Sequence, residues 1–103
     1  MKKLLILKAT ESSKQNAEKI AKLLVKRRIA ACVSLQEIIS IYSWEDEINK
    51  ENEIEIVVKS KPDKLNILIE FLKAELSYDI PQLIYQIYES ELDYFKWVNN
   101  YVN

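Results

Sequence analysis

"RRIAACVSLQEIISIYSWEDE", residues 27–47, is the stretch that decides the fold. Apolar residues alternate with polar or small ones from Ala30 to Trp44, which predicts one unusually long strand. The apolar positions shift from odd to even residue numbers around Gln36 and Glu37. This change of phase predicts a bend or bulge in the middle of the strand.

The segments on either side supply three more elements. Residues 2–9 form an apolar run with charged ends, as in a strand covered on both faces. Ser12, with Gln15 three residues later, is typical of a capping box that begins a helix. Residues 45–52 are expected to form a hairpin loop in which Asn49 and Asn52 supply the turn conformations. Residues 53–60 then return as a strand.

The second half of the chain repeats this alternation of helix and strand. Pro62 and Asp63 begin a second helix, residues 77–82 form a loop, residues 83–89 form a fourth strand, and Ser90 precedes a short final helix. The order β-α-β-β-α-β-α predicts an α+β sandwich of the ferredoxin-like type, with an antiparallel four-stranded sheet and an extra C-terminal helix. We expect a single domain spanning residues 1–103.

The composition excludes several classes of site. The chain has no glycine, so phosphate-binding glycine loops and EF-hands are excluded. It has no histidine and one cysteine, which removes the commonest general base and metal ligand and any internal disulfide. With 15 Lys and Arg against 16 Asp and Glu, no strong attraction to nucleic acid or membrane is expected. We expect a cytoplasmic protein.

The strands are apolar on both faces, although two helices can cover only one face of the sheet. Leu4 and Ile6 alternate with Leu5 and Leu7, so both sets of side chains need shelter from water. Large exposed apolar patches mark interfaces. The pattern therefore favours self-association.

Several segments together resemble the CutA family, the divalent-cation tolerance proteins. They are Ala30 to Val33, the pair Tyr42 and Trp44, Lys59 before the second helix, and the loop of Tyr78, Asp79 and Pro81. The order and spacing hold from Leu4 to Trp97. The resemblance implies a homotrimer that acts in tolerance of divalent metal ions, copper among them, without enzymatic activity. It leaves open a ligand-sensing trimer similar to nitrogen-regulatory signalling proteins, with no metal role.

The chain departs from the family at its copper ligands. Where some members have a cysteine at the end of the first strand, this chain has Lys8, and Leu76 stands near the position of a family histidine. The resemblance therefore implies no metal ligand at these positions, and copper is a cofactor by family resemblance only. Cys32 lies among small apolar residues of the long strand and is predicted to be a structural thiol.

The sharpest candidate site combines Tyr42, Trp44, Lys59, Tyr78 and Asp79. One cation, one carboxylate and aromatic walls suit a small-molecule ligand. The same residues also suit an interface, with Lys59 and Asp79 as an ion pair. The six acidic residues between positions 45 and 55 are expected to be solvated. An RNA-binding domain lacks its aromatic signature here, and an acylphosphatase-like hydrolase lacks its anion-binding loop.

Overall fold

A four-stranded antiparallel sheet and three helices make up the computed structural model, which describes residues 1–103. The strands are β1 (Lys3–Glu11), β2 (Cys32–Trp44), β3 (Glu47–Ser60) and β4 (Ile84–Glu89), in the order β2-β3-β1-β4. The helices are α1 (Lys14–Lys26), α2 (Leu65–Glu75) and α3 (Leu92–Tyr101), with a 3-10 turn, η1 (Pro62–Lys64), before α2. The expected α+β ferredoxin-like arrangement with its extra C-terminal helix is confirmed.

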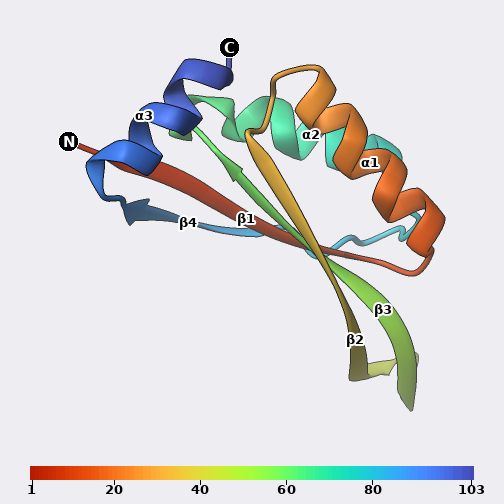
Figure 1. Cartoon of the computed structure of the whole chain (residues 1–103). Coiled ribbons are helices and arrows are strands. Elements are labelled where there is room, and N and C mark those ends of the chain that lie inside the picture. Colours follow the sequence, from red (N-terminus) through yellow and green to blue (C-terminus); the bar gives the residue numbers. More distant parts are fainter.

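The main core lies between the sheet and helices α1 and α2, which run side by side over one face (Figure 1). Odd-numbered residues of β1 and even-numbered residues of β3 point into it, led by Leu5, Leu7, Ile56 and Val58. Helix α1 begins after Ser13, whose hydroxyl accepts a hydrogen bond from the backbone N–H of Asn16. The predicted cap at Ser12 was therefore one residue early.

Helix α3 shelters part of the opposite face of the sheet. Leu4, next to Leu5 but pointing to the other side, is buried with Ala31, Val98 and Val102 in a second, smaller cluster. Beyond this cluster the second face stays open, and every residue of β4 is exposed. The structure thus leaves apolar side chains of the sheet without a covering layer.

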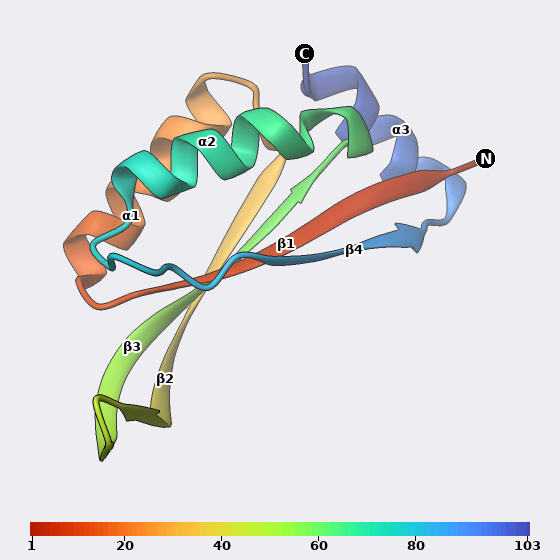
Figure 2. The same cartoon turned by 180° about the vertical axis from the view of Figure 1, so that it is seen from behind.

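The outer half of the β2–β3 hairpin projects beyond all three helices (Figures 1 and 2). The molecule measures 45 × 24 × 22 Å and its radius of gyration is 14.4 Å. A compact chain of this length has a radius of gyration of about 13 Å. The projecting hairpin accounts for the extra extension.

Two details of the hairpin differ from the sequence prediction. The β2–β3 pairing runs without a bulge from Cys32 opposite Lys59 to Trp44 opposite Glu47. The change of phase has another cause. In the inner half of β2, which lies under the helices, odd-numbered residues such as Val33 and Leu35 are partly buried. Farther out, the even-numbered residues Ile38 and Ser40 are less exposed than their odd-numbered neighbours. The loop is two residues long, Glu45 and Asp46, so residues 47–52 belong to β3.

The turn itself is unusual for a chain without glycine. Glu45 and Asp46 both have positive φ angles, 51° and 65°. Two consecutive left-handed residues match the right-handed twist of a two-residue hairpin, for which Asn-Gly is the preferred sequence. The remaining positive φ, 59°, belongs to Arg28 after helix α1.

Candidate functional site

A groove of about 690 Å³ lies between the projecting hairpin and the loop that precedes β4. Its walls come from residues 40–53 of the hairpin and residues 77–82 of the loop, and Thr10 at the end of β1 contributes to the lining. A cavity of this size is in the range of small-molecule sites. It is the candidate functional site of the chain.

Four of the five residues predicted to form a site line this groove. They are Tyr42 and Trp44 from β2, and Tyr78 and Asp79 from the loop. Tyr42 and Trp44 share a face because they are two residues apart on one strand. The side chain of Trp44 is half exposed.

Lys59 is the exception. It lies at the inner end of β3, opposite Cys32 and Ile6, whereas the groove is beside the outer end of the same strand. Its Nζ donates a hydrogen bond to Ser34 Oγ. The predicted ion pair with Asp79 does not form: the ion pairs of the chain are Lys3–Glu89 and Lys19–Glu75. Consequently, the groove has no basic side chain in its lining.

Two tyrosine–carboxylate hydrogen bonds organise the groove. Tyr78 donates to Glu53 Oε2 at 2.5 Å, and Tyr42 donates to Glu51 Oε1 at 2.9 Å. Burial and the hydrogen bond to Glu53 raise the pKa of the Tyr78 hydroxyl far above its ordinary value. The bond to Glu51 raises the pKa of Tyr42. Both hydroxyls therefore stay protonated and hold the carboxylates in place.

A buried carboxylate fixes the loop that carries Tyr78. Glu11, at the end of β1, accepts hydrogen bonds from the backbone N–H and the hydroxyl of Ser77 at 2.8 and 2.7 Å, and from the backbone N–H of Ser13 at 3.0 Å. Burial acts to raise the pKa of Glu11, but these hydrogen bonds outweigh it and hold the pKa below its ordinary value. Glu11 thus positions one wall of the groove without lining it.

The other predicted positions lie outside the groove. Cys32 is a free, half-buried thiol at the inner end of β2. Lys8 is exposed on β1, and Leu76 is buried in the main core. Leu76 is thus a core residue, and its side chain has no metal-binding atom. No group of three or more Cys, Asp or Glu side chains in the chain is placed to hold a metal ion.

Sequence reasoning missed several polar residues of the groove, among them Thr10, Glu51 and Glu53. Both glutamates were expected to be solvated as part of the acidic run between positions 45 and 55, and Glu51 was also placed in an eight-residue hairpin loop. The signal that could have found them is the alternation of Glu51, Glu53 and Glu55, which places the three side chains on one face of a strand.

None of the three helices has the length and the apolar character needed to cross a lipid bilayer.

The fold and the groove define a ferredoxin-like α+β protein with a projecting central hairpin. The model of one family, described as "CutA1 divalent ion tolerance protein", matches residues 5–101. The chain therefore belongs to the CutA1 divalent ion tolerance family.

Individual relatives match this chain over nearly their whole length. The divalent-cation tolerance protein CutA of Pyrococcus horikoshii is 32% identical over 96 residues, which cover 92% of this chain and 94% of the relative. The crystal structure of CutA1 from that organism superposes with a TM-score of 0.92 at 31% identity, covering 96% of this chain and 98% of the other. The structure of CutA from Synechococcus elongatus PCC7942 has a TM-score of 0.95 at 27% identity, covering 100% and 93%.

Proposed function

We propose that this protein acts in the tolerance of divalent metal ions, as a homotrimer and without enzymatic activity. The observation that carries the proposal is the family match over residues 5–101, together with relatives of nearly equal length that are named divalent-cation tolerance proteins. The groove supports the absence of catalysis. Its tyrosines donate to carboxylates and stay protonated, so they offer no activated nucleophile.

The homotrimer is supported by the distribution of apolar surface. Ile39, Ile41, Trp44 and Ile48 on the hairpin are all at least half exposed, and β4 exposes Ile84 and Tyr85. These residues lie on or beside β2 and β4, the two edges of the sheet. If the β2 edge of one copy contacts the β4 edge of the next copy, three copies can close into a ring. In such a ring no sheet edge stays exposed.

Metal tolerance does not require a resident metal in this proposal. The family positions for copper ligands hold Lys8 and Leu76, and no side-chain group is arranged for a metal ion. In this proposal copper is not a cofactor of the protein but the ion whose excess the cell tolerates. We further propose a cytoplasmic location, since the one cysteine is free and the fold needs no disulfide. The relative from Archaeoglobus fulgidus is described as a periplasmic divalent cation tolerance protein.

A second function is favoured by the groove itself. Its volume and polar lining suit a small organic ligand, which would make the protein a ligand-sensing regulatory trimer with no metal role.

Two experiments test the proposal. Cells deprived of the protein should grow more poorly on raised copper, zinc or cobalt, and expression of this chain should restore growth; equal growth of both strains would contradict metal tolerance. Native mass spectrometry of the purified protein gives the subunit count together with any retained metal or metabolite. A monomer would contradict the assembly, and a retained metabolite without a metal phenotype would favour the second function.

A further inference from the structure

The floor of the groove carries polar groups that the chain itself leaves without partners. Thr10 is 7% exposed, and its hydroxyl makes no hydrogen bond within the chain. Glu53 is 8% exposed, and Tyr78 occupies one of its two carboxylate oxygens. Every fully buried side-chain oxygen of the chain has a hydrogen-bond partner. The Thr10 hydroxyl and the second oxygen of Glu53 have none, so they are open to the groove that both residues line. A ligand that fills the groove displaces the water at these two oxygens, so it has to supply hydrogen-bond donors to them.

The charge of the groove indicates that the ligand is positively charged. Glu51, Glu53 and Asp79 line it, and no lysine or arginine does. Trp44 and Tyr42 add aromatic faces, which attract cations. An anion or a nucleotide would meet three carboxylates and no compensating positive charge.

The geometry distinguishes an organic cation from a metal ion. The carboxylates do not form a group of three that could hold a metal. Glu51 and Glu53 are instead two positions apart along β3, a spacing of roughly 7 Å. Each is held by its own tyrosine, and each keeps one oxygen free of that bond. Two separated carboxylates match two separated positive charges better than one compact ion.

We propose that this groove binds a short aliphatic diamine, with one ammonium group at Glu53 and Thr10 and the other near Glu51. The hydrocarbon spacer of the ligand lies against Ile80 of the loop, which is apolar and largely exposed. This inference goes beyond metal tolerance, since it assigns an organic ligand to residues that hold no metal.

Calorimetry on the native assembly at low salt tests the proposal, with putrescine as the probe and butylamine and magnesium chloride as comparisons. Putrescine should bind at least tenfold more tightly than butylamine, because only the diamine engages both carboxylates. Equal affinity of the two amines, or no heat at millimolar putrescine, would overturn the proposal. Competition by magnesium at equal concentration would also overturn it, since the site would then prefer a metal ion.

Two variants locate the site. Glu53→Gln keeps a carbonyl that can accept from Tyr78 but removes the charge, and should weaken putrescine binding on the order of tenfold. Thr10→Val removes a hydroxyl that has no partner in the chain, and should weaken binding severalfold while the fold persists.

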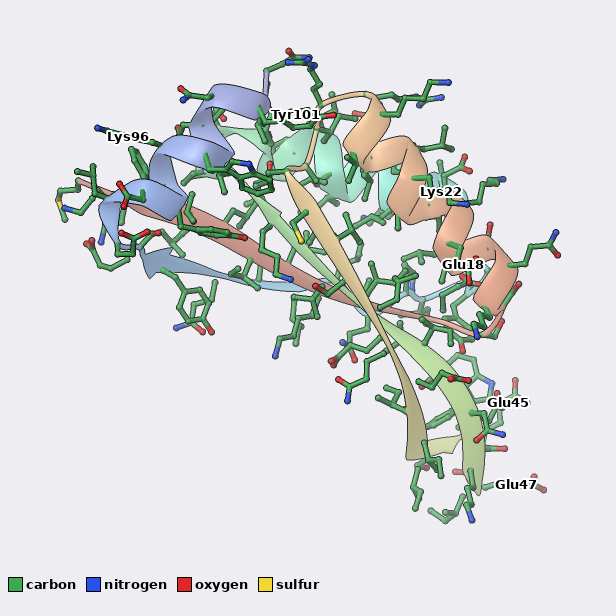
Figure 3. All side chains as sticks on the ribbon, viewed as in Figure 1. Glu18, Lys22, Glu45, Glu47, Lys96 and Tyr101 are labelled. Atoms are coloured by element: carbon green, nitrogen blue, oxygen red, sulfur yellow. The ribbon has the colours of Figure 1, made fainter.

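The matched control is Glu18→Gln, which removes the same charge from the exposed face of α1, away from the hairpin tip that Glu45 and Glu47 mark (Figure 3). It should leave the affinity unchanged. An equal loss in Glu18→Gln and Glu53→Gln would show that only the net charge of the protein attracts the amine, and would overturn the site.

Discussion

The hydroxyl of Tyr78 donates a hydrogen bond of 2.5 Å to Glu53, across 25 positions of sequence. It joins the loop before β4 to the base of the projecting hairpin, so that two segments that are mobile in many proteins share one anchor. Glu11 holds the same loop from the other side through Ser77. The groove is therefore shaped before any ligand enters.

Tyr78→Phe should lower the free energy of unfolding by about 1–3 kcal/mol, because it leaves the nearly buried carboxylate of Glu53 without its donor. Chemical denaturation measures the change. Tyr94→Phe on α3 is the control, since the hydroxyl of Tyr94 makes no hydrogen bond within the chain. Equal stability of the two variants would show that the Tyr78 bond contributes nothing net.

Glu11→Gln should destabilise the protein by about 2 kcal/mol at neutral pH, since an amide replaces a carboxylate that accepts three hydrogen bonds. The pKa of Glu11 is lowered in the folded state from an ordinary value of 4.5. Its contribution is thus complete above pH 4.5 and is lost as the pH falls through the lower folded-state pKa. Urea unfolding at a series of pH values should show the gap between wild type and variant closing in acid. A gap independent of pH would contradict this origin.

Replacing Glu45-Asp46 by Asn-Gly should stabilise the protein by about 1–2 kcal/mol, because both residues have positive φ angles that cost energy for side chains with a Cβ atom. Thermal unfolding measures the gain. Arg28→Gly relieves the same kind of strain but loses the guanidinium that stacks 4.7 Å from the ring centre of Tyr101, so it should gain less. A loss of stability in the Asn-Gly variant would show that the two acidic side chains contribute contacts of their own.

Trp44→Ala should weaken self-association by about 2 kcal/mol per contact while the helices stay intact, because a half-exposed indole on a projecting hairpin is a typical interface anchor. Sedimentation over a dilution series, followed by circular dichroism, measures both. Ile67→Ala on the outer side of α2, also about half exposed, is the control. Unchanged assembly of the Trp44 variant would assign Trp44 to the groove alone.

Cys32→Ala should leave any copper affinity unchanged and lower the stability slightly, since the thiol is half-buried and belongs to no group of three or more potential metal ligands. Calorimetry with copper, run beside wild type, measures this. Loss of tight copper binding in the variant would make Cys32 a ligand.

The fold could be predicted from the alternation of apolar residues, because each element has a clear period and a recognisable start. The turn could not. Glutamate and aspartate in consecutive left-handed conformations carry no turn signature, so a longer loop around Asn49 was the natural expectation.

That error left Glu51 out of the predicted site, although four of the five predicted residues line the groove. With a two-residue turn, Tyr42 lies opposite Asn49, and Glu51 becomes a strand residue that faces the groove beside Glu53. Lys59 was misplaced for a related reason. The predicted site needed Lys59 near Tyr42, but residues near the two ends of a hairpin this long cannot meet in one pocket. The groove lies at the outer end of the hairpin, beside the loop before β4, and this placement follows from the three-dimensional path of the hairpin rather than from the sequence pattern.

The position of β1 in the middle of the sheet has a consequence for synthesis on the ribosome. The first strand pairs with β3 and with β4, and its register joins Lys3 to Glu89. Its apolar run therefore leaves the exit tunnel long before either neighbour exists, while the β2–β3 hairpin can close as soon as it emerges. We expect the hairpin to form first and the apolar β1 segment to need chaperone protection until β4 has left the tunnel. Folding should accordingly be slow for a chain of this size, as it is wherever distant strands must meet.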